Sequence, residues 1–121
     1  GEVGGDAAAT FTLPAATGTG SVFKFVVSVV NTSNYLIKVA DATDTIDGQI
    51  IITDADGTAA TSFVTAAASD TITLNGTTTG GGAIGDYVEL IDIASNQYAV
   101  SGMVTCAAGS NIATMFSATV S

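Results

Sequence analysis

Carboxylates are the main groups in this chain that could do chemistry, since 11 Asp and Glu residues accompany two Lys and Arg, one Cys and no His. The motif Asp54-Ala55-Asp56-Gly57 suggests a calcium loop, because Ca²⁺ takes about six to eight closely spaced oxygen ligands. Three more acids precede it: Asp41, Asp44 and Asp47. A helix–loop–helix calcium site would have Gly and Glu where the chain has Ala59 and Thr65. We therefore expect ordinary Asp-Gly turns and no metal site, with an adventitious surface ion as the alternative.

A glycine-rich segment, residues 80–86, has the composition of a phosphate-binding loop or of a calcium-binding nonapeptide. A phosphate loop would continue into Lys-Ser or Lys-Thr and a helix, and the calcium repeat would occur in several copies. Neither pattern is present, so the segment predicts a flexible loop or hairpin. Asp86, Glu89 and Asp92 suggest a glycosidase pair, but along a strand Asp86 and Asp92 point away from Glu89. We expect these acids to be solvated or hydrogen-bonded structural groups.

Nucleophilic catalysis lacks a base in this sequence. There is no His or Arg, and neither Lys24 nor Lys38 lies in a Ser-x-x-Lys motif. The single Cys106 cannot form an internal disulfide and is expected to be a small buried hydrophobe. The net charge of −9 repels nucleic acids and anionic membranes. We therefore expect no enzymatic activity, no cofactor and no nucleic-acid or membrane partner.

Residue types predict an all-β fold, because Thr, Val and Ile together number 41 whereas Leu, Glu, Lys, Gln, Met and Arg number 12. Alternation is clearest in residues 22–30, where Phe23, Phe25, Val27 and Val29 share one face. We expect an antiparallel β-sandwich or barrel of about nine short strands with an extended N-terminal arm. Apart from the arm, strands are predicted at 22–30, 35–39, 46–53, 61–66, 71–74, 86–93, 97–105 and 112–120.

The connecting segments predict several local features. Residues 31–34 are short and polar, so the strands on either side are expected to form a hairpin. Asn75-Gly76 can adopt the positive φ values of a tight hairpin turn. Gly48 predicts a bulge or a close backbone approach within its strand. Strand 86–93 has apolar residues on both faces, which predicts a central strand covered on both sides.

Composition divides the chain into an arm, residues 1–20, and a β-sandwich domain, residues 21–121. Within the arm, Phe11-Thr12-Leu13-Pro14 suits an edge strand that docks on its own domain or on a neighbour. The many Ala and Gly residues predict a thin core, so large apolar residues near both termini are expected to contact partner subunits. The candidate contact residues are Phe11, Leu13, Pro14, Met115 and Phe116. Alternatively, Phe11 and Phe116 fill the two ends of a monomeric sandwich.

Five short motifs follow one another along the chain, and their types and order carry a resemblance to a known family. They are Leu13-Pro14, residues 23–27, Thr73-Leu74-Asn75-Gly76-Thr77, Gly85-Asp86 with Glu89-Leu90, and Tyr98-Ala99-Val100-Ser101-Gly102. Over most of its length, the chain resembles small tailed-phage proteins known as head decoration, cement or head-fibre proteins. Tyr98 stands where that pattern has Trp, and the N-terminal segment is too short for a separate anchoring domain.

The resemblance implies a non-enzymatic virion protein, commonly a homotrimer, that binds the major capsid protein on the outer surface of an icosahedral head. It would stabilise the head against the internal pressure of the DNA. One alternative is a carbohydrate- or receptor-binding fibre module, in which Tyr35, Tyr87 and Tyr98 could stack on sugars, although core packing is the commoner role of tyrosine. Exposed aromatics beside Asn and Asp in one cleft would favour it. Another is a surface-layer or pilus subunit, which an N-terminal donor strand inserted into the next protomer would favour.

Overall fold

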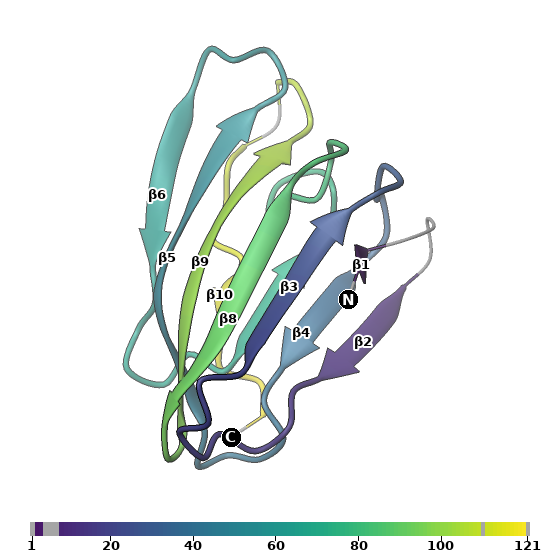
Figure 1. Ribbon diagram of the computed structural model, residues 1–121. Helices are drawn as coiled ribbons and strands as arrows, with labels where there is room; N and C mark the ends of the chain where they lie inside the picture. The colour runs from purple at the N-terminus through teal and green to yellow at the C-terminus, as the bar shows by residue number, and fades with distance from the viewer. Residues whose placement is uncertain (1, 4–7, 110, 121) are drawn as a thin grey trace.

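Two β-sheets pack face to face in the computed structural model, which describes residues 2–3, 8–109 and 111–120 (Figure 1). The strands are β1 (Glu2–Val3), β2 (Ala9–Thr12), β3 (Val22–Val27), β4 (Tyr35–Lys38), β5 (Thr45–Asp54), β6 (Ala60–Val64), β7 (Thr71–Leu74), β8 (Tyr87–Ala94), β9 (Gln97–Cys106) and β10 (Phe116–Ser117). The six-stranded sheet has the order β1-β3-β8-β9-β5-β6, and the four-stranded sheet β10-β7-β4-β2. The predicted all-β sandwich is confirmed, and the sheets do not close into a barrel.

Parallel pairs make both sheets mixed, so the expectation of a purely antiparallel sandwich is wrong. β1 runs parallel to β3, β2 to β4 and β5 to β9. The alternation of side chains along a strand determines which face is buried, but it carries no information on the direction of the neighbouring strand. The pattern therefore predicts the strands and leaves their order open.

Two expected hairpins are wrong for the same reason. β3 pairs with β8 in the six-stranded sheet, whereas β4 pairs with β7 and β2 in the other, so residues 28–34 cross between the layers. The chain crosses again between β7 and β8. Gly76 does adopt a positive φ of 79°, but it does so in this connection between the sheets rather than in a hairpin. A short polar loop suits a change of sheet as well as a hairpin.

Two predicted strands also differ from expectation. Of residues 112–120, only the two residues of β10 form a strand, which pairs with β7. β8 is central in its sheet, between β3 and β9, but only one of its faces is buried. Val88, Leu90 and Asp92 face the core, whereas Glu89 and Ile91 on the other face are partly exposed. Apolar residues on the outer face of β8 thus lie on the surface of the molecule.

The core between the sheets consists of large aliphatic and aromatic side chains. Among the described alanines, only Ala16 belongs to it, so the alanine content does not make it thin. Phe11 on β2 packs edge-to-face on Phe25 of β3, with ring centroids 5.0 Å apart. The largest fully buried side chains are Tyr98, Phe25, Leu13, Ile37, Ile46, Ile50, Ile52, Ile72, Leu74, Leu90 and Met115.

Residues 8–20 of the expected arm are part of the sandwich. β2 forms an edge strand beside β4 of the same chain, and Leu13 N donates to Lys38 O at 2.8 Å. Of the two docking sites considered for this strand, its own domain and a neighbour, the described residues take the first. The remaining arm residues, 1 and 4–7, lie outside the described part of the chain.

Gly48 lies where β5 and β9 approach closely, as its place within a strand predicts. Its φ is +145°, and a Cβ atom there would be 2.1 Å from the carbonyl oxygen of Val100. Its N–H donates to Thr65 Oγ1 at 3.0 Å, and its carbonyl accepts from Thr65 N at 3.0 Å. Both contacts hold the end of β6 against β5.

We predict that Gly48→Ala lowers the free energy of unfolding by more than about 3 kcal/mol, because the new methyl group would force β5 and β9 apart. Gly57→Ala is the control, since Gly57 has a positive φ of 70° but open space around its Cβ position. We expect that variant to lose about 1–2 kcal/mol from backbone strain alone. Urea unfolding measures both, and equal losses would contradict the close approach.

Candidate functional site

The side chain of Asp92 on β8 accepts hydrogen bonds from the segment that precedes β3. Its carboxylate accepts hydrogen bonds from Thr17 N at 3.1 Å, Gly18 N at 2.6 Å and Thr19 Oγ1 at 3.0 Å. Burial raises the pKa of Asp92, but the hydrogen bonds from residues 17–19 outweigh it, so the pKa is lowered. Asp92 is therefore the structural, hydrogen-bonded acid that we expected.

Asp86 holds the glycine-rich segment in the same way. One carboxylate oxygen accepts from Gly81 N at 3.2 Å and Thr105 N at 2.7 Å, and the other accepts from Thr105 Oγ1 at 2.9 Å. Burial raises the pKa of Asp86 in spite of these hydrogen bonds. The N–H group of Gly81, which a phosphate cradle would need, points at the chain's own carboxylate. Glu89 lies on the opposite face of β8 from Asp92, as predicted, so these two acids form no pair.

Asp54 closes the turn in which the sequence suggested a calcium loop. Its carboxylate accepts from Thr58 N at 3.1 Å and Thr58 Oγ1 at 3.0 Å, and Gly57 N donates to its carbonyl at 2.9 Å. The predicted Asp-Gly turn is confirmed. Within the described residues, no three His, Cys, Asp or Glu side chains are arranged to hold a metal ion.

A face of the six-stranded sheet, rather than any acid cluster, is the most distinctive surface. We call the side turned away from the four-stranded sheet the outer face. One row of side chains crosses it over five neighbouring strands, and the strand registers place its members side by side. This row, which we call the apolar row, consists of Val26, Tyr87, Met103, Ile51 and Ser62. Met103 is 52% exposed and Ile51 43%, so water contacts much of it.

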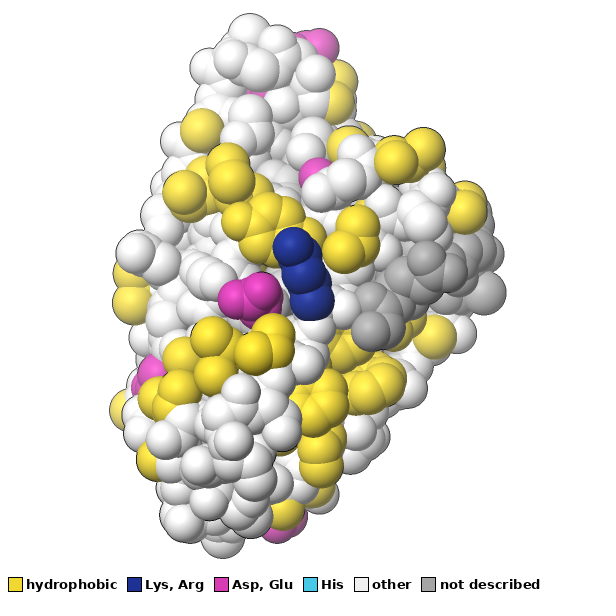
Figure 2. All heavy atoms as spheres, in the orientation of Figure 1, with side chains coloured by type: hydrophobic (Ala, Val, Ile, Leu, Met, Phe, Trp, Pro, Cys, Tyr) yellow, Lys and Arg dark blue, Asp and Glu magenta, His cyan; other side chains and the backbone are white. Residues whose placement is uncertain are grey.

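Two further rows of side chains lie beside the apolar row on the outer face, one after the other along the strands. Lys24 lies opposite Glu89, which lies opposite Ser101, and Lys24 Nζ is 4.9 Å from the centroid of the Tyr87 ring. Beyond them, Val22 lies opposite Ile91. Figure 2 shows hydrophobic side chains on both sides of one basic and one acidic group. This face is thus mainly uncharged, although the chain carries a net charge of −9.

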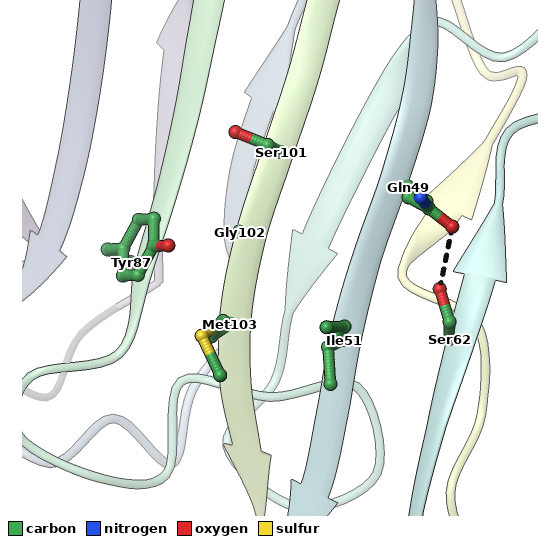
Figure 3. Close-up of a pocket in the computed structure, with 7 residues that line it drawn as sticks. All are labelled: Gln49, Ile51, Ser62, Tyr87, Ser101, Gly102 and Met103. Carbon is green, nitrogen blue, oxygen red and sulfur yellow. Dashed lines mark hydrogen bonds between the residues drawn. The ribbon is translucent and has the colours of Figure 1, made fainter.

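The apolar row borders a hollow of about 390 Å³ (Figure 3). Gly102 lies beneath it, and a Cβ atom there would be 2.5 Å from the carbonyl oxygen of Tyr87. Ser62 Oγ donates to Gln49 Oε1 at 3.1 Å along one side of the hollow. The missing side chain at Gly102 therefore lets β9 approach the backbone of β8 closely beneath the hollow.

The structure places most of the candidate contact residues inside the molecule. Leu13, Met115 and Phe116 are buried, Phe11 is half-buried against Phe25, and only Pro14 is exposed. Burial of Phe11 and Phe116 within the single chain agrees with the second interpretation of these residues. The sequence could not distinguish core from contact residues near the termini, because both are large and apolar.

The three tyrosines do not meet in one cleft. Tyr98 is buried and donates its hydroxyl proton to the carbonyl oxygen of Pro14 at 2.5 Å. Tyr35 is half-buried, with its ring 6.5 Å from that of Phe25. Tyr87 alone lies on the outer face. Alternation places Tyr87 and Val88 on opposite faces of β8. Only the sheet partners of β8 show that the face of Tyr87 is the exposed one.

Comparison with known proteins identifies no relative of this chain. The chain matches no protein family, curated protein or solved structure. In the part of the chain that the structure describes, no helix is long and apolar enough to cross a membrane. The outer face is consequently the surface on which a functional proposal rests.

We predict that the stabilising contribution of Asp92 disappears in acid. Its folded pKa lies below the unfolded value, so the contribution is present above about pH 4 and is lost as the pH falls through the folded pKa. The free energy of unfolding of the wild type should exceed that of Asp92→Asn at neutral pH, and the difference should shrink below about pH 4. Urea unfolding across this range measures it.

Two controls accompany this experiment. Asp56→Asn is the control for the loss of one negative charge at an exposed turn. Asp86 has a raised folded pKa, so its stabilising contribution is present at low pH and is lost as the pH rises through that pKa. The wild type should therefore lose stability relative to Asp86→Asn on going from acid to neutral pH. The same pH trend for Asp92 and Asp86 would contradict the assigned shifts.

We predict that EDTA leaves the melting temperature unchanged, because Thr58 already hydrogen-bonds both carboxylate oxygens of Asp54. An ion bound only by the folded state would raise stability by mass action, and its removal would lower the melting temperature. Thermal unfolding with EDTA, and again after excess Ca²⁺ is added, measures this. A drop that Ca²⁺ reverses would show a structural ion.

Proposed function

We propose that this chain is a non-enzymatic structural protein of a virion, which decorates the outside of an icosahedral phage head and stabilises it. In this proposal the outer face binds the major capsid protein. The single observation that carries it is the apolar row, which crosses five strands and remains exposed to water in the single chain.

The position of the motifs that resemble head decoration proteins supports the choice of surface. Residues 23–27 lie on β3, Glu89-Leu90 on β8 and residues 98–102 on β9. These three strands are neighbours in the six-stranded sheet. Their outward-facing residues include members of the apolar row, and their inward-facing residues include Leu90 and Tyr98 of the core.

Energetics favour a partner over this face. Covering apolar side chains yields about 25 cal/mol for each Å² removed from water, and the outer face presents Val26, Ile51 and Met103 together. The cost of desolvating charges there is reduced, because the opposite charges of Lys24 and Glu89 lie side by side. Acids elsewhere on the molecule would keep the decorated particle soluble.

The structural roles of the carboxylates support a non-enzymatic function. Asp54, Asp86 and Asp92 bind groups of their own chain, and the sequence offers no His or Arg to assist them. We include assembly as a homotrimer in the proposal, because an open sheet edge such as β2 can be covered within a symmetric assembly.

Among the described residues, neither alternative has the observation that would favour it. The hollow beside the apolar row is lined by one aromatic ring, Tyr87, with Gln49 and serines, and by neither Asn nor Asp. A fibre module that stacks sugars would bring several rings to one cleft. β2 pairs with β4 of its own chain, whereas a donor strand would pair with the next protomer.

We predict that Ile51→Glu with Met103→Glu abolishes attachment to heads stripped of this protein. Two carboxylates buried in the contact without partners should weaken binding at least about 100-fold. Cosedimentation with stripped heads measures binding, and circular dichroism checks the fold.

Val29→Glu with Ile84→Glu is the matched control, because both residues are exposed and lie outside the strands of the outer face. This control should bind as the wild type does. Normal decoration by the Ile51 and Met103 variant would overturn the assignment of the surface. A cryomicroscopy map of the source particle that shows no density for this protein on the head would overturn the proposed function.

A further inference from the structure

β6 is an open edge of the six-stranded sheet. It pairs with β5 along one side, and it is the last strand in the order of the sheet (Figure 1). Thr65 N donates to Gly48 O, and Asp54 N donates to Ala59 O, so the odd-numbered residues of β6 direct their backbone groups toward β5. The N–H and C=O groups of Ala60, Ser62 and Val64 therefore point away from the sheet.

This edge lacks the protection that natural edge strands usually have. Charged residues, proline, bulges and short length normally prevent edges from pairing with other chains. Residues 59–69 contain no charged residue, no Pro and no Gly, and the pairing of β6 with β5 is regular. Among the other described edge strands, β1 and β10 have two residues each, and β2 is soon followed by Pro14. β6 is thus the longest of the edge strands and the least protected.

We propose that β6 pairs antiparallel with β6 of a second copy of this chain, about a twofold axis at Ser62. In this register, Ser62 lies opposite Ser62 of the second copy, and Ala60 lies opposite its Val64. The outward N–H and C=O groups of these three residues then all find partners. Residues with the same parity face each other, so outer-face side chains remain on the outer face in both copies.

A second copy fits this edge better than a charged partner strand for two reasons. First, the apolar row ends at Ser62, so a twofold pair joins the rows of two copies into one continuous stripe. Second, each copy carries a net charge of −9, and β6 provides an uncharged segment along which like-charged copies can approach. Salt assists, because exposed charges are screened beyond about 8 Å at physiological ionic strength.

The pairing does not depend on the proposed attachment to phage heads. If the chain forms trimers, the twofold contacts of all three subunits would join two trimers into an assembly of about six copies. If it does not, the contact makes a dimer. In either case, loss of the contact halves the number of copies in the assembly.

The test is the mass of the purified full chain at micromolar concentrations, measured by light scattering and sedimentation at physiological salt. Ser62→Pro removes an outward N–H group and leaves the ladder with β5 intact, and Ser62→Lys places like charges opposite each other at the twofold axis. We expect both variants to have half the mass of the wild type. Ser62→Ala is the control, which keeps the N–H group and should keep the full mass.

Circular dichroism and urea unfolding confirm that each variant is folded. If Ser62→Pro were unfolded, Ser62→Lys would still decide, because it alters no backbone group. Equal masses for the wild type and all folded variants would overturn the proposal. Since no phage heads are present in this experiment, failure of the proposed attachment would leave its result unchanged.

Discussion

Hydrogen bonds from the backbone to buried aspartate side chains hold the connecting segments of this fold in place. Asp92 binds residues 17–19, Asp86 binds Gly81 and Thr105, and Asp70 accepts from Thr119 N at 2.9 Å. A buried N–H group without an acceptor costs about 1–3 kcal/mol, and a sandwich whose chain crosses repeatedly between sheets has many such groups outside its ladders. With a single cysteine and two basic residues, the chain has neither an internal disulfide nor many salt bridges to hold these segments.

The same constraint explains why, among the described residues of an acidic sequence, no cluster of carboxylates forms a metal site. A carboxylate that accepts two or three hydrogen bonds from its own chain has few lone pairs left for a metal ion or a substrate. The opposite pKa shifts of Asp86 and Asp92 reflect the balance between desolvation and these bonds. Our proposal therefore places the function on the outer face, which is mainly uncharged.

Local features could be read from the sequence, whereas the connections between strands could not. Alternation located the core positions of β3, and Gly48 indicated a bulge or a close backbone approach, of which the structure shows the close approach, to Val100. Parity along a strand also separated Glu89 from Asp92 correctly. It could not show that residues 28–34 change sheets, nor that Met115 and Phe116 fill the core, because burial near a terminus depends on which strands lie above it.

The apolar row illustrates why this surface could not be found without the strand order. Val26, Tyr87, Met103 and Ile51 are far apart in the sequence, and each is an unremarkable outward residue of its own strand. Only the sequence of neighbours β3-β8-β9-β5 and their registers bring the four together. The parallel pair of β5 and β9 is the decisive step, since an antiparallel register there would place a different residue beside Met103. The pairing of strands that are distant in the sequence thus determines both the fold and this surface.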